Sequence, residues 1–312
     1  MDISSKIYVA GHNGMVGSSL VRALKDAGHS NLLLRTRQEL DLTDSLGVMS
    51  FFEIERPEYV FLAAAKVGGI LANSIYKADF LLENLQIQNS VISAAHEFNV
   101  KKLLFLGSSC IYPKYADQPI SEKSLFTGEL EPTNDAYAVA KIAGIKLCQS
   151  YREQYGDDFI CAMPTNLYGP NDNYDLETSH VVPALVRKFV EAKQSEAGMV
   201  EIWGSGNPKR EFLHVDDLAK ACLFLMENYS SEEIINVGVG KDLSIRELAI
   251  LIQKYAGYEG ELVFNTDRPD GTPRKVLDTS RINNLGWFPT IGLEEGLEKE
   301  IVNYQQSSSI GS

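Results

Sequence analysis

The chain has 312 residues, of which 44% are hydrophobic and 23% are charged, and these proportions are typical of an ordinary globular protein. This length favours one large domain with a smaller lobe over a single simple core. The formal net charge of −13 argues against a nucleic acid or an anionic membrane as the binding partner, because both are polyanions and would repel the protein.

Short apolar segments rich in β-branched residues alternate with longer helix-like segments. The pattern predicts strands at residues 6–10, 31–34, 59–63, 102–106, 159–163 and 234–238. It predicts helices near residues 15–27, 45–54, 78–98, 135–155 and 216–228. Strands that are apolar on both faces and alternate with helices indicate a parallel sheet covered on both sides. The predicted fold class is therefore α/β, a Rossmann-type doubly wound parallel sheet with a smaller C-terminal substrate-binding lobe.

The regular alternation ends near residue 165, where long loops such as NLYGPNDNYDLETSH and RPDGTPRK begin to appear. Loops of this length in a compact protein are usually functional or disordered. We therefore expect residues 1–165 to form a dinucleotide-binding domain to which a segment near 213–238 returns. Residues 166–312 are expected to form mainly the substrate-binding lobe, which closes over the carboxyl ends of the strands.

The cysteines and the hydropathy pattern indicate where the protein works. The four cysteines form no CxxC pair and no zinc-type spacing, so no metal site is predicted and a reducing compartment is favoured. No signal peptide opens the chain, and no apolar run approaches the roughly 20 residues that a membrane-spanning helix needs. We therefore expect a cytoplasmic protein.

Three glycines follow the first predicted strand directly and lead into a helix. Gly11, Gly14 and Gly17 have the spacing GxxGxxG, a variant of the GxGxxG turn of dinucleotide-binding proteins. Glycine permits a tight turn and a close backbone approach, and the amino end of the next helix then faces a pyrophosphate. A plain turn is the alternative, but the position inside a strand–helix unit favours a dinucleotide cofactor.

Two arginines, Arg35 and Arg37, stand at the end of the second predicted strand. In NAD-binding proteins an acidic residue about 20 positions beyond the glycines holds the ribose hydroxyls, whereas an arginine there accommodates a 2′-phosphate. Guanidinium groups can bind such a phosphate bidentately, and a carboxylate would repel it. A solvated basic turn is the alternative. The arginines favour NADP as the cofactor.

The segment NDAYAVAKIAG places Tyr137 and Lys141 four residues apart, so they share one face of a helix. A tyrosine has an ordinary pKa of ~10, and a neighbouring ammonium group favours the phenolate and lowers that value. A YxxxK pair is common by chance, and a tyrosine stacked over a lysine stem is the alternative. Ser108 ends the fourth predicted strand, so its hydroxyl and that of Tyr137 could hold a carbonyl oxygen together.

The glycine turn, the strand-end serine and the YxxxK pair resemble the extended short-chain dehydrogenase/reductase superfamily. Longer strings are more specific, and from about residue 6 to 300 they are similar to those of the GDP-L-fucose synthase family within it. These strings are AAAKVGGI, GSSCIYPK, EPTNDAYAVAKIAGIKLC, PTNLYGPNDN, WGSGNPKREFLHVDDLA and PDGTPRK. The resemblance implies epimerisation of GDP-4-keto-6-deoxy-D-mannose at carbons 3 and 5, followed by NADPH-dependent reduction of the 4-keto group.

The resemblance also implies roles for Cys110 and His180, which would handle the carbon-bound protons during epimerisation. A thiol with an ordinary pKa of ~8.5 and an imidazole near 6.5 bracket neutral pH, which suits an acid/base couple. From the residues alone, Cys110 could equally be a small buried hydrophobe and His180 a helix cap. The order in which they act at each carbon stays open.

The remaining site residues are likewise expectations from the resemblance. The expected cofactor-binding residues are Gly11, His12, Asn13, Gly14, Met15, Val16, Gly17, Arg35, Arg37, Asp41, Leu42, Lys141, Pro164, Asn166, Leu167 and His180. The expected substrate-binding residues are Ser109, Asn166, Lys188, Trp203, Arg210 and Asp270. By analogy with related reductases, the long helices near 78–98 and 135–155 suggest a homodimer.

Two other functions are compatible with the same motifs. A sugar-nucleotide 4-epimerase or dehydratase of the superfamily would hold and recycle NAD, and Arg35, Arg37 and Cys110 speak against it. A non-catalytic NADP-sensing protein would usually lack the tyrosine or the lysine, and both are present here.

Overall fold

The computed structural model describes residues 1–268 and 270–310, which are built around a six-stranded parallel sheet. The strand order is β10-β5-β4-β3-β1-β2, so successive strands are added on one side of β1 by β2 and on the other side from β3 onward, with the switch point between β1 and β3, as in doubly wound sheets. The strands are β1 (Ile7–Ala10), β2 (Leu32–Leu33), β3 (Tyr59–Leu62), β4 (Lys102–Leu106), β5 (Phe159–Pro164) and β10 (Ile235–Val237). All six predicted strands and the predicted α/β fold class are confirmed.

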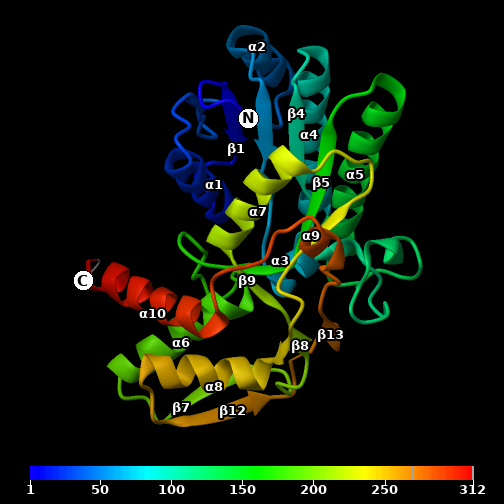
Figure 1. Cartoon of the computed structure of the whole chain (residues 1–312). Helices are drawn as coiled ribbons and strands as arrows, with labels where there is room; N and C mark the ends of the chain where they lie inside the picture. Colours follow the sequence, from blue (N-terminus) through cyan, green and yellow to red (C-terminus); the bar gives the residue numbers. More distant parts are fainter. Residues whose placement is uncertain (269, 311–312) are drawn as a thin grey trace.

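Helices cover both faces of this sheet (Figure 1). They are α1 (Met15–Asp26), α2 (Ser45–Glu55), α3 (Ile70–Ile75), α4 (Lys77–Glu97), α5 (Asp135–Tyr155) and α7 (Val215–Asn228). Side chains of α2, α4 and α5 share one core cluster with the sheet, and those of α1 and α7 share a second cluster with its other face. This two-sided burial explains why the strand sequences are apolar without alternation. The five predicted helices are confirmed within two residues at each end.

The second lobe is formed from short strands and three longer helices around its own core cluster. Strands β7 and β12 pair in parallel, β8 lies between β11 and β13, and β6 pairs with β9. The strands are β6 (Asn166–Tyr168), β7 (Met199–Trp203), β8 (Lys209–Arg210), β9 (Phe212–His214), β11 (Leu243–Ser244), β12 (Glu261–Asn265) and β13 (Arg274–Lys275). The helices are α6 (Val181–Gln194), α8 (Ile245–Ala256) and α10 (Leu293–Ile310), whereas the short helix α9 (Ser280–Asn284) packs beside β10 of the central sheet.

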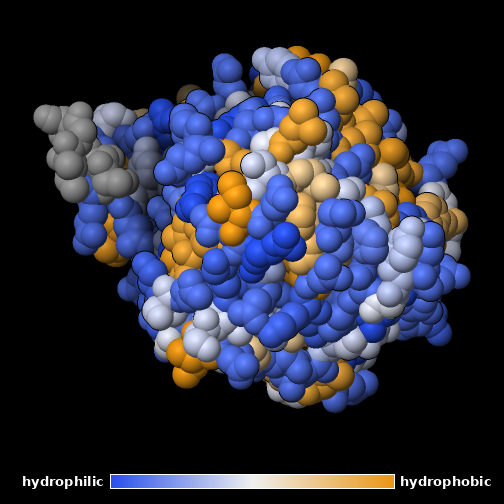
Figure 2. Space-filling view, turned by 90° about the horizontal axis from the view of Figure 1, so that it is seen from above, coloured by the Kyte–Doolittle hydropathy of each residue, from blue (hydrophilic) through white to orange (hydrophobic). Residues whose placement is uncertain are grey.

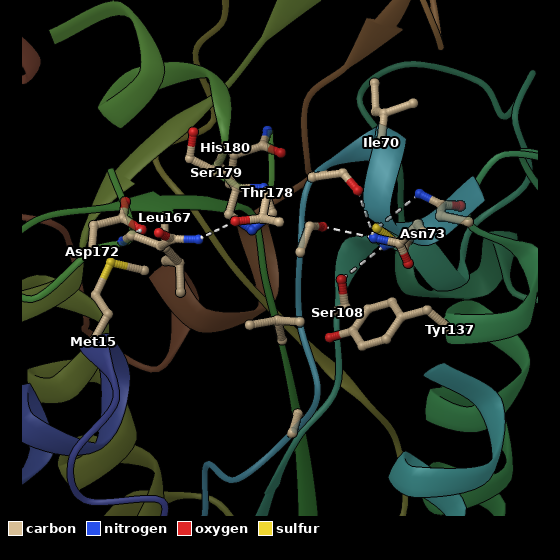
Figure 3. Close-up of a pocket in the computed structure, with 18 of the residues that line it drawn as sticks. Met15, Ile70, Asn73, Ser108, Tyr137, Leu167, Asp172, Thr178, Ser179 and His180 are labelled. Atoms are coloured by element: carbon tan, nitrogen blue, oxygen red, sulfur yellow. Dashed lines mark hydrogen bonds between the residues drawn. The ribbon is translucent and has the colours of Figure 1, made fainter. Parts of the chain in front are cut away.

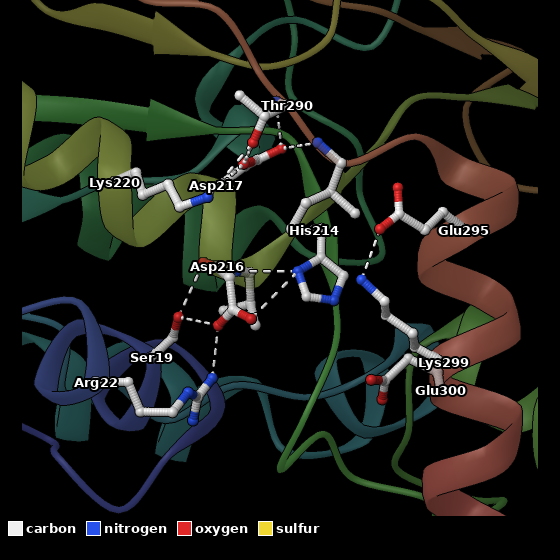
Figure 4. Close-up of polar contacts among 12 residues, drawn as sticks. Ser19, Arg22, His214, Asp216, Asp217, Lys220, Thr290, Glu295, Lys299 and Glu300 are labelled. Carbon is white, nitrogen blue, oxygen red and sulfur yellow. Dashed lines mark hydrogen bonds and ion pairs between the residues drawn. The ribbon is translucent and has the colours of Figure 1, made fainter. Parts of the chain in front are cut away.

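The start of α7 joins distant parts of the chain (Figure 4). Asp216 accepts hydrogen bonds from Ser19 and Arg22 of α1, each at 2.6 Å. The buried Asp217 accepts from the backbone and hydroxyl of Thr290, both at 2.8 Å, and so anchors the segment that leads into α10. These contacts fix the C-terminal helix relative to the cofactor-side helix α1.

The face shown in Figure 2 is mainly hydrophilic, and its hydrophobic residues lie in separate groups between hydrophilic ones. The exposed apolar side chains include Leu82 of α4 and Val139 of α5. Within the described ranges, 1–268 and 270–310, no helix combines the length and apolar character that crossing a membrane requires.

Candidate active site

A cleft of about 820 Å³ lies at the carboxyl ends of the central strands. This volume is at the upper end of the range for ligand sites in proteins, which is roughly 300–1,000 Å³. Residues from both lobes line the cleft, and Figure 3 shows Ser108 and Tyr137 on one side and Thr178, Ser179 and His180 on another. The fold therefore brings a dinucleotide-type turn and the second lobe to one cavity.

The glycine turn between β1 and α1 leaves no room for a side chain at Gly11 or Gly17. Gly11 has φ +86°, and a Cβ there would lie 2.8 Å from the backbone of Ala64. A Cβ on Gly17 would lie 2.0 Å from the carbonyl oxygen of Gly11. Gly14 has no side chain with which to cap α1, so the first amides of that helix can face an anion in the cleft. This geometry fits a dinucleotide pyrophosphate.

The residues of this turn do not all reach the cleft. Its lining includes Gly11, Gly14, Met15, Val16 and Gly17. The other two predicted members, His12 and Asn13, lie outside the lining as the described residues define it. Cofactor contacts from the turn are therefore expected from backbone amides and the apolar side chains of Met15 and Val16 rather than from these two polar residues.

Arg35 and Arg37 both line the cleft beyond the end of β2. Arg35 pairs with Glu55 at 2.7 Å and lies over the ring of Phe51 at 5.3 Å. Arg37 pairs with Glu83 at 3.0 Å. These acidic partners orient the two guanidinium groups without filling all of their donors, since each guanidinium has five N–H groups. The pair fits a 2′-phosphate.

Ser108, Tyr137 and Lys141 converge where β4 ends and α5 begins. The Ser108 oxygen accepts a hydrogen bond from the backbone N–H of Cys110 at 3.2 Å, which fixes the serine side chain. Lys141 is buried, and its ammonium donates to the carbonyl oxygen of Leu106 at 2.8 Å. Lys141 Nζ lies 5.8 Å from the centre of the Tyr137 ring. The ring of Tyr137 therefore lies near a cation that is fixed in place.

The acid–base properties of this group differ from the expectation in one respect. Burial and the charge of Cys110 raise the pKa of Tyr137, whereas a hydrogen bond with Ser108 lowers it by less. Burial also lowers the pKa of Lys141 to about 8. The expected lowering of the Tyr137 pKa by Lys141 is therefore not seen, because loss of solvent around the phenol dominates. A neutral phenol is suited to donating a proton to an oxygen.

Cys110 is held between two polar neighbours. Asn134 Nδ2 donates to the Cys110 Sγ at 3.4 Å, and Lys275 Nζ donates to it at 3.5 Å. Cys110 is a partly exposed free thiol on the short 3₁₀-helix η1 (Ser109–Ile111), and it lines the cleft. A positive charge therefore stands next to the sulfur, where a proton would be taken up or released.

His180 precedes α6 and opens into the same cleft as Cys110. The imidazole lies in the cleft, where loss of solvent lowers its pKa, and the charge of Lys275 lowers the pKa further. The imidazole is therefore neutral at pH 7 in the free protein. Lys275 thus influences both predicted proton-handling groups.

The predicted substrate-side residues Lys188, Trp203, Arg210 and Asp270 also line the cleft. Trp203 is 41% exposed, and Lys188 Nζ lies 5.4 Å from its ring centre. Burial lowers the pKa of Arg210, while the nearby charges of Cys110, Glu131 and Asp270 raise it. Two cations and an exposed aromatic face suit a ligand that carries both phosphates and a flat ring.

The remaining predicted residues all reach the cleft. These are Asp41, Leu42, Ser109, Pro164, Asn166 and Leu167. The side-chain amide of Asn166 donates to the carbonyl of Glu211 at 2.9 Å, which fixes the segment after β5. Asp270 accepts from the backbone and hydroxyl of Ser205, both at 2.7 Å, so it also holds the turn after β7.

Among the cleft residues that were not selected from the sequence are Lys275, Asn134 and Glu131. Lys275 belongs to the PDGTPRK string and Asn134 precedes α5, so the quoted motifs contained both. The sequence does not show that Lys275 contacts Cys110, because the two residues lie 165 positions apart in the chain. Glu131 stood within a quoted string but carried no local pattern that pointed to a site.

Comparisons with known proteins agree with this geometry. Residues 7–238 match the model of the NAD dependent epimerase/dehydratase family. The chain is 60% identical to "Putative GDP-L-fucose synthase 2" of Arabidopsis thaliana over 96% of this chain and 91% of the plant protein. It is 55% identical to "GDP-L-fucose synthase" of Escherichia coli (strain K12), with 94% of each chain covered. A solved GDP-L-fucose synthetase from Naegleria fowleri bound to NADP superposes with TM-score 0.91 at 29% identity, covering 99% of this chain and 96% of that one.

Proposed function

Because the chain belongs to the GDP-L-fucose synthase family, within the NAD dependent epimerase/dehydratase family, we propose that the residues around its cleft carry out a two-stage reaction on one GDP-sugar. The protein is an NADP-dependent oxidoreductase with epimerase activity. It converts GDP-4-keto-6-deoxy-D-mannose to GDP-L-fucose by epimerisation at carbons 3 and 5 and reduction of the 4-keto group. The convergence of Ser108, Tyr137 and Cys110 in one cleft is the observation that carries the residue assignments.

Ser108 and Tyr137 hold the 4-keto oxygen of the substrate. Removal of a proton from carbon 3 or carbon 5 gives an enolate, and hydride addition to carbon 4 gives an alkoxide. Negative charge develops on the same oxygen in both stages, so one pair of hydroxyl donors stabilises both transition states. The raised pKa of Tyr137 keeps its proton available for the alkoxide. Ser108 stays oriented by the backbone N–H of Cys110.

Cys110 and His180 handle the protons on carbons 3 and 5. One group removes the proton as a base, and the other returns a proton to the opposite face of the same carbon. No net proton is gained or lost in an inversion, because the base ends protonated and the acid ends deprotonated. The neutral imidazole of His180 can accept a proton as the base, and the charge of Lys275 beside Cys110 stabilises the thiolate that forms when the thiol acts as the acid.

The cofactor is held by the glycine turn, by Arg35 and Arg37, and by the residues from Pro164 to Leu167. When bound, NADPH supplies the hydride for the reduction of carbon 4. The ammonium group of Lys141 is fixed by its hydrogen bond to the carbonyl of Leu106, and it can also donate to a ribose hydroxyl of the cofactor. We assign residues 1–165, with the returning segment near 213–238, to the cofactor and residues 166–312 mainly to the GDP-sugar.

A single reaction tests the function directly. Purified protein is supplied with GDP-4-keto-6-deoxy-D-mannose and NADPH in deuterated water. We expect NADPH oxidation and a product with solvent deuterium at carbons 3 and 5, measured by mass spectrometry and NMR. If NAD co-purifies with the protein and added NADPH is not oxidised, the protein would instead be a 4-epimerase or dehydratase.

Arg37 tests how the cofactor is selected. Replacing Arg37 by Gln removes a cation from the cleft, so we expect KM for NADPH to rise about ten- to hundredfold, as for the loss of a charged hydrogen bond. KM for NADH, which lacks the 2′-phosphate, should change little. The matched control is Arg56→Gln, since Arg56 is exposed and lies over the ring of Phe98, away from the cleft lining. Equal effects on the two cofactors would contradict a role in phosphate recognition.

A homodimer and a cytoplasmic location complete the proposal. The exposed Leu82 and Val139 on the adjacent helices α4 and α5 support a partner surface there. The free thiols of Cys110, Cys148, Cys161 and Cys222 suit a reducing compartment. Light scattering of the purified protein measures the first property, and cell fractionation measures the second.

A further inference from the structure

A small chamber of about 20 Å³ adjoins the cleft beside Cys110. Its lining includes Cys110, Lys114, Glu131, Asn134, Thr272 and Lys275. The chamber thus borders Cys110, one of the two proton-handling groups, and also includes Lys114, which does not line the cleft among the described residues.

The chamber has the size and polarity that a single water molecule needs. A water requires roughly 10–15 Å³ of this kind of volume and two to four polar partners. Asn134 Oδ1 is buried and has no hydrogen-bond partner among the described residues, while Nδ2 of the same amide donates to the Cys110 Sγ at 3.4 Å. A buried acceptor of this kind is normally satisfied by protein or by ordered water.

Glu131 lies on the same chamber, and its carboxylate is fixed by several donors. Lys114 Nζ lies 3.0 Å from its Oε2, and the Thr272 hydroxyl donates to the same oxygen at 3.4 Å. Burial raises the pKa of Glu131, but Lys114 and Thr133 lower it by more, so the group is ionised at neutral pH. The Lys114 side chain is 25% exposed, so this end of the network reaches the protein surface.

We propose that one water molecule in the chamber connects the Cys110 thiol with the Glu131 carboxylate and lets the thiol exchange its proton with solvent while the substrate fills the cleft. This inference rests on the proposed function, because it concerns the protons of the epimerisation stage. Glu131 is thereby a positioning residue that acts through Cys110.

The proton transfer balances without any further reactant. The thiol gives its proton to the water, and the water gives one of its own to Glu131, leaving a thiolate and a neutral carboxylic acid. The acid then releases the proton to solvent beside Lys114, and the reverse sequence returns a proton to the thiolate. Lys275, 3.5 Å from the sulfur, and the nearby charge of Arg210 stabilise the anions formed on the way.

This proton path would restore the protonation state of Cys110 between the two inversions that occur at the same site. After a first inversion, a Cys110 thiolate that served as base has become a thiol that carries the proton of carbon 3 or 5. A second inversion with the same assignment needs that proton to leave before the product does. If the thiol were isolated, the same proton would return to carbon, and solvent hydrogen would enter the sugar slowly.

The test uses Glu131→Gln, which keeps the shape of the side chain and its acceptor oxygen but cannot accept the proton. The enzyme is incubated with NADP⁺ and GDP-4-keto-6-deoxy-D-mannose in deuterated water, so that exchange is measured without reduction. We expect deuterium incorporation at carbons 3 and 5 to fall about tenfold, at the lower end of effects on acid–base catalysis because Glu131 acts through a water. With NADPH, the ratio of fucose to the 4-reduced sugar that has not been epimerised should fall in parallel.

Two controls separate this role from a structural one. Glu129→Gln removes a carboxylate of the same segment whose side chain is exposed and lies outside the chamber lining, and it should leave the ratio unchanged. Thr272→Val removes one donor to Glu131 while keeping its carboxylate, and should lower the ratio by less than Glu131→Gln does. KM for the GDP-sugar should stay constant in all three variants.

Several results would overturn the proposal. They are unchanged exchange in Glu131→Gln, a proportional loss of exchange and reduction, or a raised KM for the GDP-sugar with the product ratio intact. If Glu131→Gln does not fold, an unchanged ratio in Thr272→Val overturns it. A parent enzyme that incorporates no deuterium would instead refute the epimerase function itself, so the two failures are distinguishable.

Discussion

Replacing Tyr137 by Phe should lower the rate of NADPH oxidation with GDP-4-keto-6-deoxy-D-mannose by about 10²- to 10⁴-fold, the usual contribution of a general acid. The phenylalanine fills the same half-buried space on α5 but has no proton for the alkoxide at carbon 4. Exchange of the protons at carbons 3 and 5 should also fall, by about 10²- to 10³-fold, since the enolate oxygen loses one of its two donors. Steady-state kinetics and deuterium incorporation measure the two effects separately.

Binding of NADPH should be nearly unchanged in Tyr137→Phe, which shows that the loss is chemical. Fluorescence titration of the cofactor provides this control. Tyr115→Phe is the matched variant, because Tyr115 is 79% exposed and should tolerate the change without effect. Full turnover by Tyr137→Phe would place the proton donor elsewhere, and Ser108 would be the next residue to examine.

The core of the cofactor-side fold was predictable because its sequence signals are local. The strands β1, β3, β4 and β5 are apolar on both faces, and this follows directly from helices packing on both sides of the sheet. The turn at Gly11 and Gly17 was also predictable, since no side chain fits at either position. A local sequence therefore sufficed wherever a local steric or burial requirement determined it.

The second lobe was less predictable because its strands are short and pair over long distances. Arg274 of β13 pairs with Lys209 of β8, and Glu261 of β12 pairs with Met199 of β7. A two-residue strand such as β13 has no periodicity to detect, so its neighbours are fixed only by the tertiary fold. This pairing brings Lys275 to Cys110, a contact that no local sequence pattern indicates.

The solvent exposure of individual site residues also could not be predicted from the sequence. The spacing of Tyr137 and Lys141 correctly predicted a shared region of α5, but the direction of the pKa shift depended on how deeply the phenol is buried. Trp203 could have been core or ligand contact, and only its 41% exposure at the cleft favours contact. The sequence shows which side chains are present, but their exposure to solvent depends on how the chain packs.

Cys110→Ser should separate the two stages of the reaction. A serine hydroxyl keeps the place of the thiol beside Asn134 but ionises far less readily, so it is a poor base and a poor acid near neutral pH. We expect deuterium incorporation at carbons 3 and 5 to fall about 10²- to 10⁴-fold. Reduction should continue, because Ser108 and Tyr137 still hold the 4-keto oxygen. The main product then becomes a 4-reduced sugar that has not been epimerised, as identified by NMR.

The product ratio makes this result independent of how much enzyme is active. A variant that merely folds poorly would lose both stages in proportion, and its ratio of epimerised to non-epimerised sugar would match that of the parent. Cys148→Ala is the matched control, since Cys148 is a fully buried thiol of α5 that faces the core rather than the cleft. Equal incorporation of deuterium by Cys110→Ser and the parent would remove the thiol from the mechanism. His180 and solvent would then have to transfer the protons at carbons 3 and 5, because the thiol would not be needed for exchange.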